Sequence, residues 1–272
     1  MSALPERLPA MAGRFYPGRP DQLRAELRAC MPHASADPAV RVCIGPHAGY
    51  VYSGRIYGET LAQVEVPRRV ILIGPNHTGR GATVSLWAGG SWHFPGFEVA
   101  IDRPMVEALA ATGSFELDLD AHYEEHCLEV QVPFLAARQS QLALTPIVLS
   151  GLRIEDCRRL GEHLAAVVEA QPLGGPVLLA ISTDMSHFES AKRARELDAL
   201  ALARVEAMDP EGLYAVVRGE GISMCGFIPT TVALFYARAR GLSHCRLVRY
   251  GHSGEVSGDL RRVVGYAGLV IS

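Results

Sequence analysis

Two apolar runs of this chain end in the same short pattern, Gly-Pro followed closely by a histidine. RVCIG (41–45) continues into PHAGYVYSG, and RVILIG (69–74) continues into PNHTGRG, with the helically spaced RIYGETLAQV between them. A buried run, a turn, a helix and a second buried run are typical of a β-α-β unit with parallel strands. This pattern constrains the fold strongly, because parallel strands need helices on both faces of their sheet.

The same alternation continues to the end of the chain. Further strands are predicted at 144–150, 176–182, 246–251 and 263–272, and a hairpin or excursion at 83–101. Helices are predicted over 21–30 (capped by Asp21), 103–113 (capped by Asp102, with Gly113 at its end), 124–138 (with Pro133 as a kink or a new start), 155–170, 190–208, 210–218 (capped by Asp209) and from about 229 to Gly241. We predict one α/β domain over 1–272, with a central, mostly parallel or mixed sheet flanked by helices.

Composition narrows the range of functions. The formal net charge is −3, from 26 basic and 29 acidic residues, which predicts no nucleic-acid partner and no anionic membrane surface. No apolar run reaches the roughly 18 residues of a membrane span, and the first residues lack the apolar core of a signal peptide. The six cysteines are far apart, which excludes a zinc ribbon and predicts reduced thiols in a cytoplasmic protein. Because there is no Walker A loop, no G-x-G-x-x-G after a strand and no G-x-S-x-G elbow, we predict neither a nucleotide cofactor nor serine hydrolase chemistry.

Polar residues follow three of the predicted strands. His47 follows the strand at 41–45, His77 follows 69–74, and Asp184 and His187 follow 176–182. Loops at the carboxyl ends of strands in open α/β sheets converge on the ligand site, so these side chains are expected to share a pocket. Each residue also has a plainer interpretation: either histidine could bond to loop backbone, and Asp184 could cap the next helix.

Two further segments carry candidate ligands. In EEHCLEVQ, His126 and Glu129 are three apart and share a helix face, so they could ligate a metal, pair beside the ligands, or contact substrate. Cys225 lies in SMCGFIPTT at a predicted helix start, where backbone amides and the helix dipole would lower its pKa. The alternative for Cys225 is a small buried apolar side chain. Two histidines and a thiolate suit iron, copper or zinc.

One rival motif competes for the same segment. HYEEH (122–126) fits the H-x-x-E-H pattern of inverted zinc proteases, with His122 and His126 as ligands and Glu125 as base. The sequence shows no obvious downstream helix with a third carboxylate ligand, which argues against this interpretation.

Several segments, in order along nearly the whole chain, resemble the Memo-like family, known in prokaryotes as protein B of the AmmeMemoRadiSam system. They are AGRFYPG (12–18), GPHAGYVYSG (45–54), GPNHTG (74–79), EEHCLEVQVPFL (124–135), STDMSHF (182–188), CGFIPTT (225–231) and YGHSGEVSGDLRRVVGYAGLVI (250–271). A collinear set of this kind is far more specific than any one motif.

This resemblance implies a fold like that of class III extradiol dioxygenases, whose non-haem iron is held by two histidines and a carboxylate. By the resemblance, His47 and His77 match the two histidine ligands. Cys225 occupies the third-ligand position, which departs from the carboxylate of the dioxygenases. His187 matches their acid/base histidine, with Asp184 beside it.

Three functions are consistent with these residues. The first is a metal-dependent redox enzyme for a small molecule, with iron as the first expectation and copper or zinc as alternatives. There His187 would move protons, Asp184 would orient it, and Tyr50 or Tyr52 would supply a hydroxyl. The second is a peptide- or protein-binding module using the same cleft, and the third is a zinc-dependent hydrolase. The resemblance also implies a functional link to a radical-SAM protein and an AMMECR-type protein. His252 stands where the family leads us to expect a polar residue such as Asn, either as a pocket donor or as surface variation.

Overall fold

The middle of the molecule is a mixed sheet whose central strands are parallel. The structure, a computed structural model, describes residues 4–171 and 175–272. The parallel strands lie in the order β1 (Val42–Gly45), β8 (Val177–Ser182), β2 (Arg69–Pro75) and β7 (Ala143–Leu149). Every residue of these strands is buried, which explains why they are nearly continuous apolar runs in the sequence. The four predicted strands are therefore confirmed as parallel neighbours.

The remaining strands extend both sides of this parallel centre. Beyond β1 lie β11 and then β10, both antiparallel, and beyond β7 lie β3, antiparallel to β7, and then β6. Strands β4 and β5 form a hairpin, and β5 also pairs with the start of β7. The short β9 pairs with β11. The bounds of these strands are β3 Val84–Trp87, β4 Trp92–Phe94, β5 Phe97–Ile101, β6 Glu116–Asp118, β9 His187–Glu189, β10 Cys245–His252 and β11 Val263–Ile271.

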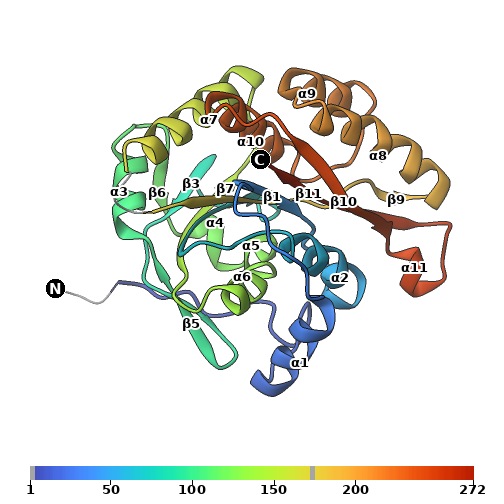
Figure 1. Cartoon of the computed structure of the whole chain (residues 1–272), viewed down its shortest axis with the longest axis horizontal. Helices are drawn as coiled ribbons and strands as arrows, with labels where there is room; N and C mark the ends of the chain where they lie inside the picture. Colours follow the sequence, from blue (N-terminus) through green and yellow to red (C-terminus); the bar gives the residue numbers. More distant parts are fainter. Residues whose placement is uncertain (1–3, 172–174) are drawn as a thin grey trace.

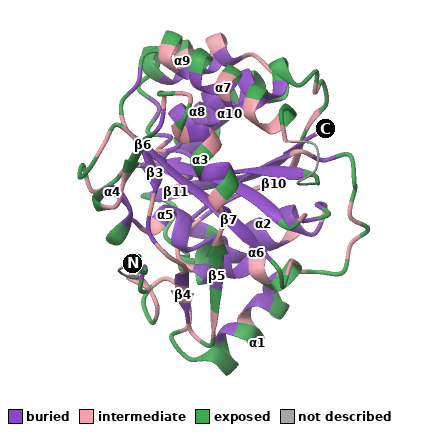
Figure 2. Cartoon of the chain, turned by 90° about the vertical axis from the view of Figure 1, so that its left-hand side faces the viewer, coloured by how far each residue is buried: buried purple, intermediate pink, exposed green. Residues whose placement is uncertain are grey.

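Helices cover both faces of the sheet, so the protein has three layers (Figure 1). One layer contains α3 Arg103–Ala110, α7 Ile154–Glu169, α8 Ala191–Glu206, α9 Pro210–Gly219 and α10 Phe227–Ala239. The other contains α1 Pro20–Cys30, α2 Tyr50–Leu61, α5 His126–Glu129 and α6 Val132–Arg138. The short helix α11 (Gly254–Ser257) lies at the edge of the molecule in Figure 1, and the short helix α4 (Asp120–Tyr123) lies at the edge in Figure 2.

Alternate residues of each strand enter two separate cores. Val42 and Ile44 of β1 pack with the α7 and α10 side, whereas Cys43 between them packs with the α1 and α2 side. Figure 2 shows the result as a buried sheet between helices whose outer faces are exposed. The prediction of an α/β fold with helices on both faces of a mixed sheet is thus confirmed.

The prediction for the first β-α-β helix was wrong at its start. We expected helical spacing from residue 55, but α2 begins at Tyr50, whose amide N–H donates to the Phe15 carbonyl oxygen (2.8 Å). Gly54 was placed in the turn before this helix, yet it lies within the helix together with Gly58. A Cβ at Gly58 would lie 2.3 Å from the Cys30 carbonyl oxygen, so glycine is needed for the close packing of α1 on α2.

Helix caps were predicted with mixed success. Asp102 and Asp209 cap α3 and α9 as expected, each accepting a backbone N–H. Asp21 does not cap α1, because the helix begins at Pro20 and Asp21 lies in its first turn. The segment 124–138 is two helices, with Pro133 in the first turn of the second. Among the described residues, no helix is both long enough and apolar enough to cross a membrane.

Candidate metal centre

The carboxyl ends of β1, β8 and β2 are adjacent in the sheet and bring three sequence-distant segments together. His47 and His77 each lie two residues beyond their strand, and Asp184 lies two residues beyond β8. Cys225 comes from the loop before α10. One ligand atom each from His47, His77 and Cys225 lie within 4.8 Å of one another. The structure therefore gathers the three predicted ligands at one edge of the sheet.

His47 is held in a single tautomer by its buried surroundings. The Ser182 hydroxyl donates to the Cys127 carbonyl oxygen (2.6 Å), so the same hydroxyl must accept from His47 Nδ1 (2.8 Å). Nε2 therefore carries the lone pair, and it lies 3.4 Å from Cys225 Sγ. Burial and the nearby imidazoles hold the pKa of His47 well below its usual value, so the ring is neutral at pH 7.

His77 and His126 share one carboxylate, that of Glu125. Its Oε1 accepts from His77 Nδ1 (2.9 Å) and lies 3.2 Å from His126 Nδ1, while its Oε2 accepts from the His77 backbone N–H (2.6 Å). Burial opposes ionisation of Glu125, but the bonds from the two imidazoles outweigh it and lower the pKa. An ionised carboxylate only accepts, so both rings donate from Nδ1 and keep Nε2 free.

The three imidazoles form a compact cluster. Ring centroids are 4.5 Å apart for His77 and His126, and 5.2 Å apart for each of these rings with His47. A pair between His126 and Glu129 was one of the roles considered for these residues, but the carboxylate beside His126 is that of Glu125. The Glu129 carboxylate is instead engaged by the N-terminal segment.

Cys225 lies against both Asp184 and His47. Its Sγ accepts the Asp184 backbone N–H (3.2 Å). Burial and the neighbouring Asp184 carboxylate raise the pKa of the Cys225 thiol, and the amides of Asp184 and Gly226 offset this only in part. The expectation that amides and the helix dipole would lower this pKa overall was wrong, because the burial of the sulfur and the Asp184 charge outweigh the nearby amides.

Asp184 holds the backbone of the His47 loop. Its Oδ1 accepts the His47 backbone N–H (2.8 Å), and its Oδ2 lies 3.9 Å from His47 Nε2. Burial raises the pKa of the Asp184 carboxyl, although the His47 amide works against it. The alternative role as a helix cap is excluded, because α8 begins at Ala191 with Ser190 as its cap.

His187 lies on β9 with its ring fixed from one side. The Ser223 carbonyl oxygen can only accept, so it receives His187 Nδ1–H (2.8 Å) and leaves Nε2 with a lone pair. The next residue, Phe188, has a φ of 63°, a left-handed conformation that is uncommon outside glycine. The ring of His187 is thus held rigidly and is partly exposed at the site.

Three other predicted residues have different surroundings. Tyr50 is buried and its hydroxyl donates to the Val130 carbonyl oxygen (2.9 Å), so it supports the core. Tyr52 is 42% exposed and keeps a hydroxyl available to a ligand. Both Glu129 carboxylate oxygens are bonded to the N-terminal segment, including a 2.7 Å ion pair with Arg7.

Neither His122 nor His252 joins the cluster. His122 lies between Trp87 and Trp92, and its Nε2 bonds to Ser85 Oγ (2.9 Å). Since α4 and α5 are separate helices, His122 and His126 do not form the paired ligands of a zinc protease motif. His252 is buried at the end of β10, and its backbone N–H donates to the Glu255 carboxylate (3.2 Å).

Glu125 and Ser182 are the functional residues that the sequence analysis did not assign correctly. Glu125 was considered only as a protease base, and Ser182 only as a strand end. A ligating imidazole needs a hydrogen-bond acceptor on its other nitrogen. The sequence offered two such acceptors near the histidines, a hydroxyl at the last position of β8 and an acidic residue before His126.

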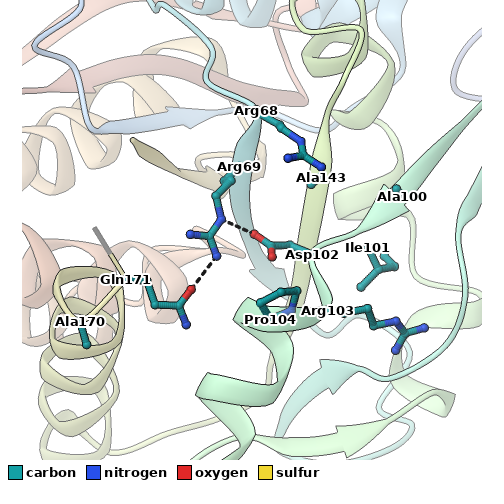
Figure 3. Close-up of a pocket in the computed structure, with 10 residues that line it drawn as sticks. All are labelled: Arg68, Arg69, Ala100, Ile101, Asp102, Arg103, Pro104, Ala143, Ala170 and Gln171. Carbon is teal, nitrogen blue, oxygen red and sulfur yellow. Dashed lines mark hydrogen bonds and ion pairs between the residues drawn. The ribbon is translucent and has the colours of Figure 1, made fainter. Parts of the chain in front are cut away.

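A separate cavity lies at the opposite edge of the sheet, where β2 and β7 begin (Figure 3). Its volume is about 730 Å³. Arg69 on its wall is already engaged by Asp102 (2.6 Å) and Gln171 (2.7 Å). Among the described residues that line this cavity there is no histidine, no cysteine and no nucleophilic pair comparable with the cluster described above.

The fold and site define an α/β protein with a histidine and cysteine cluster suited to a transition metal at the carboxyl edge of its sheet. Residues 7–270 match the family model described as Memo-like protein. A MEMO1 family protein of Methanopyrus kandleri is 35% identical over 97% of this chain and 98% of its own length. Another, from Methanosarcina barkeri, is 36% identical over 97% of this chain and 99% of its own. The chain belongs to the Memo-like family.

A solved structure supports the fold independently. An uncharacterized protein of Escherichia coli K12 superposes with a TM-score of 0.52 over 83% of this chain and 99% of its own. At 11% identity, this likeness concerns the fold alone.

Proposed function

We propose that this protein is a metal-dependent enzyme that carries out redox chemistry on a small organic molecule. The observation that carries the proposal is the convergence of His47, His77 and Cys225 within 4.8 Å, with both imidazoles in tautomers that leave Nε2 free. His47 is buried, so a free nitrogen on its ring is costly unless a ligand uses it, whereas His77 is exposed and its Nε2 is open to an incoming ligand.

The donor set fits a divalent transition metal. Two imidazole nitrogens and one sulfur suit iron, copper or zinc, and we propose iron first. When bound, such an ion supplies Lewis acidity and, for iron or copper, an electron-transfer centre. Its binding would also displace the Cys225 proton, because the thiolate is the ligating form.

The remaining residues act on the substrate through protons and orientation. His187 Nε2 is free to accept or donate a proton, since Nδ1 is fixed on the Ser223 carbonyl oxygen. The Asp184 carboxylate accepts the backbone N–H of His47. This bond fixes the position of the ligand His47 relative to the segment that carries His187. Tyr52 offers a hydroxyl at the exposed side.

Metal analysis of anaerobically purified protein tests this proposal. We expect close to one equivalent of iron or copper, which is lost in His47→Ala and reduced in Cys225→Ser. His33→Ala, which removes an exposed histidine, is the matched control and should retain the metal.

Two results would change the assignment. Protein that stays metal-free after reconstitution would refute the metal centre and favour a binding module. Stoichiometric zinc without any redox turnover would favour hydrolysis by the same cluster.

A further inference from the structure

A recess of about 570 Å³ lies beside the proposed metal centre. We call it the Arg14 recess. It is lined by Ala10, Met11, Arg14, Thr78, Arg80 and Glu124.

Two residues that line the Arg14 recess are sequence neighbours of the imidazole cluster. Thr78 directly follows the ligand His77, and Glu124 directly precedes Glu125, the carboxylate that orients two imidazoles. Next to Arg14, the ring of Phe15 lies 5.1 Å from that of His126. A ligand held at the metal centre would therefore extend only a short distance to reach the recess.

The N-terminal wall of the recess is fixed rather than loose. The backbone N–H groups of Ala10 and Met11 donate to the Glu129 carboxylate at 3.0 and 2.8 Å. Glu129 is fully buried and paired with Arg7. A wall anchored in this way can hold a substrate group in a defined position.

The charges in the recess favour an anion. Arg14 is exposed, and its guanidinium forms no hydrogen bond or ion pair with any described residue. Arg80 pairs with Glu124 at 2.9 Å, but both side chains are about 60% exposed, so the pair is weak and open to competition. Two arginines against one glutamate leave one net positive charge, which matches a singly charged carboxylate.

We propose that the Arg14 recess binds a carboxylate on the far end of the substrate whose other end is held at the metal centre. This inference rests on the proposed function and adds a substrate class to it. The planar guanidinium of Arg14 would bind the carboxylate through two N–H groups, with Arg80 as a second contact.

Paired hydroxamates test the inference, because the hydroxamate end chelates metals and the tail can be varied. Butanohydroxamate is compared with the monohydroxamate of succinate, and octanohydroxamate with the monohydroxamate of suberate, so that each pair differs only in a terminal carboxylate. Calorimetry at low salt measures the binding of each compound to zinc-loaded protein. At one of the two lengths we expect about three- to tenfold tighter binding of the carboxylate, the range for one or two partly exposed charge contacts. The preference should disappear in Arg14→Gln/Arg80→Gln and persist in Arg28→Gln, which removes an exposed arginine from α1.

The outcomes separate the two proposals. If the alkyl hydroxamates bind but the carboxylate tail gives no preference, or if the double variant keeps the preference, the Arg14 recess is not a carboxylate site. If the protein takes up no zinc when it is loaded, the metal centre is refuted and the recess proposal falls with it. If the protein holds zinc but none of the four compounds binds, the recess proposal alone is refuted.

Discussion

At the residue scale, the proposed metal centre depends on the hydrogen-bond acceptors beside its imidazoles. Each acceptor binds one ring nitrogen and so determines which nitrogen remains free. Sequence reasoning reached His47 and His77 because strand ends of a parallel sheet converge, whatever the loops contain. It did not reach the role of Glu125, because the bond from His77 to Glu125 joins positions 48 residues apart and depends on how α5 docks on β2. The approach of His47 and His77 was predictable from topology, whereas their hydrogen-bond partners required three-dimensional packing.

Glu125→Gln should weaken metal binding without removing a ligand. The Glu125 carboxylate faces two imidazoles and two backbone N–H groups with two acceptor oxygens. A glutamine side chain has one acceptor oxygen, so it can replace only some of these contacts. We expect a loss of about 10- to 100-fold in metal affinity, the usual effect of removing such a partner. Competition with a chromophoric chelator measures it. Glu124→Gln is the adjacent control, and equal affinities for the two variants would contradict the assigned role.

At the element scale, strands were predicted better than helix boundaries. Strands β1, β2, β7 and β8 are buried on both faces, so each is marked by an uninterrupted apolar run. The start of α2 depends on contacts with the N-terminal segment, and Gly58 is helical because α1 packs closely against it. Local patterns do not contain such contacts, so the first turn of α2, which includes Gly54, was taken for a loop.

Residues 7–16 have no helix or long strand and are held to the body by Glu129. Its carboxylate pairs with Arg7 and accepts from Ala10, Met11 and the Tyr16 hydroxyl. Removing one partner of a fully buried ion pair costs about 3–5 kcal/mol, so Glu129→Gln should lower the free energy of unfolding by that amount. Urea denaturation measures the loss.

Hydrogen exchange then locates the effect of Glu129→Gln. Amides in residues 7–16 should exchange faster than in the wild type beyond the general loss of stability. The exposed substitution Glu65→Gln serves as the control. Unchanged protection of 7–16 relative to the sheet would show that other contacts hold the segment.

At the scale of the whole molecule, stability is coupled to pH through histidines buried in neutral form. Burial and the nearby Arg7 lower the pKa of His122 to about 3. Above pH 6.5 the ring is neutral in both states, so it has no effect on the pH dependence. Below pH 6.5 only the unfolded chain takes up the proton, and the free energy of unfolding falls as pH decreases, until the folded state also protonates near pH 3.

His122→Gln should remove one proton from this dependence. Between pH 6 and 4, the free energy of unfolding of the metal-free wild type should fall more steeply than that of the variant, by about 1.4 kcal/mol per pH unit. Chemical denaturation at a series of pH values measures the difference in slope, which does not depend on the absolute stability of the variant. His33→Gln should behave as the wild type, and parallel curves for His122→Gln would show that this ring is protonated in the folded state.

The position of β11 has a consequence for how quickly the molecule forms. β11 lies between β10 and β1, and its Ile271 is opposite Val42, a pairing that spans most of the chain. The backbone of Gly265 in the same strand bonds to Met185 and Ser186, the two residues between Asp184 and His187. Contacts between such distant positions slow folding, because a long loop must close before they form. Assembly of the Asp184 and His187 side of the pocket therefore waits for these distant contacts to form, and refolding and recovery of the site should share a single rate.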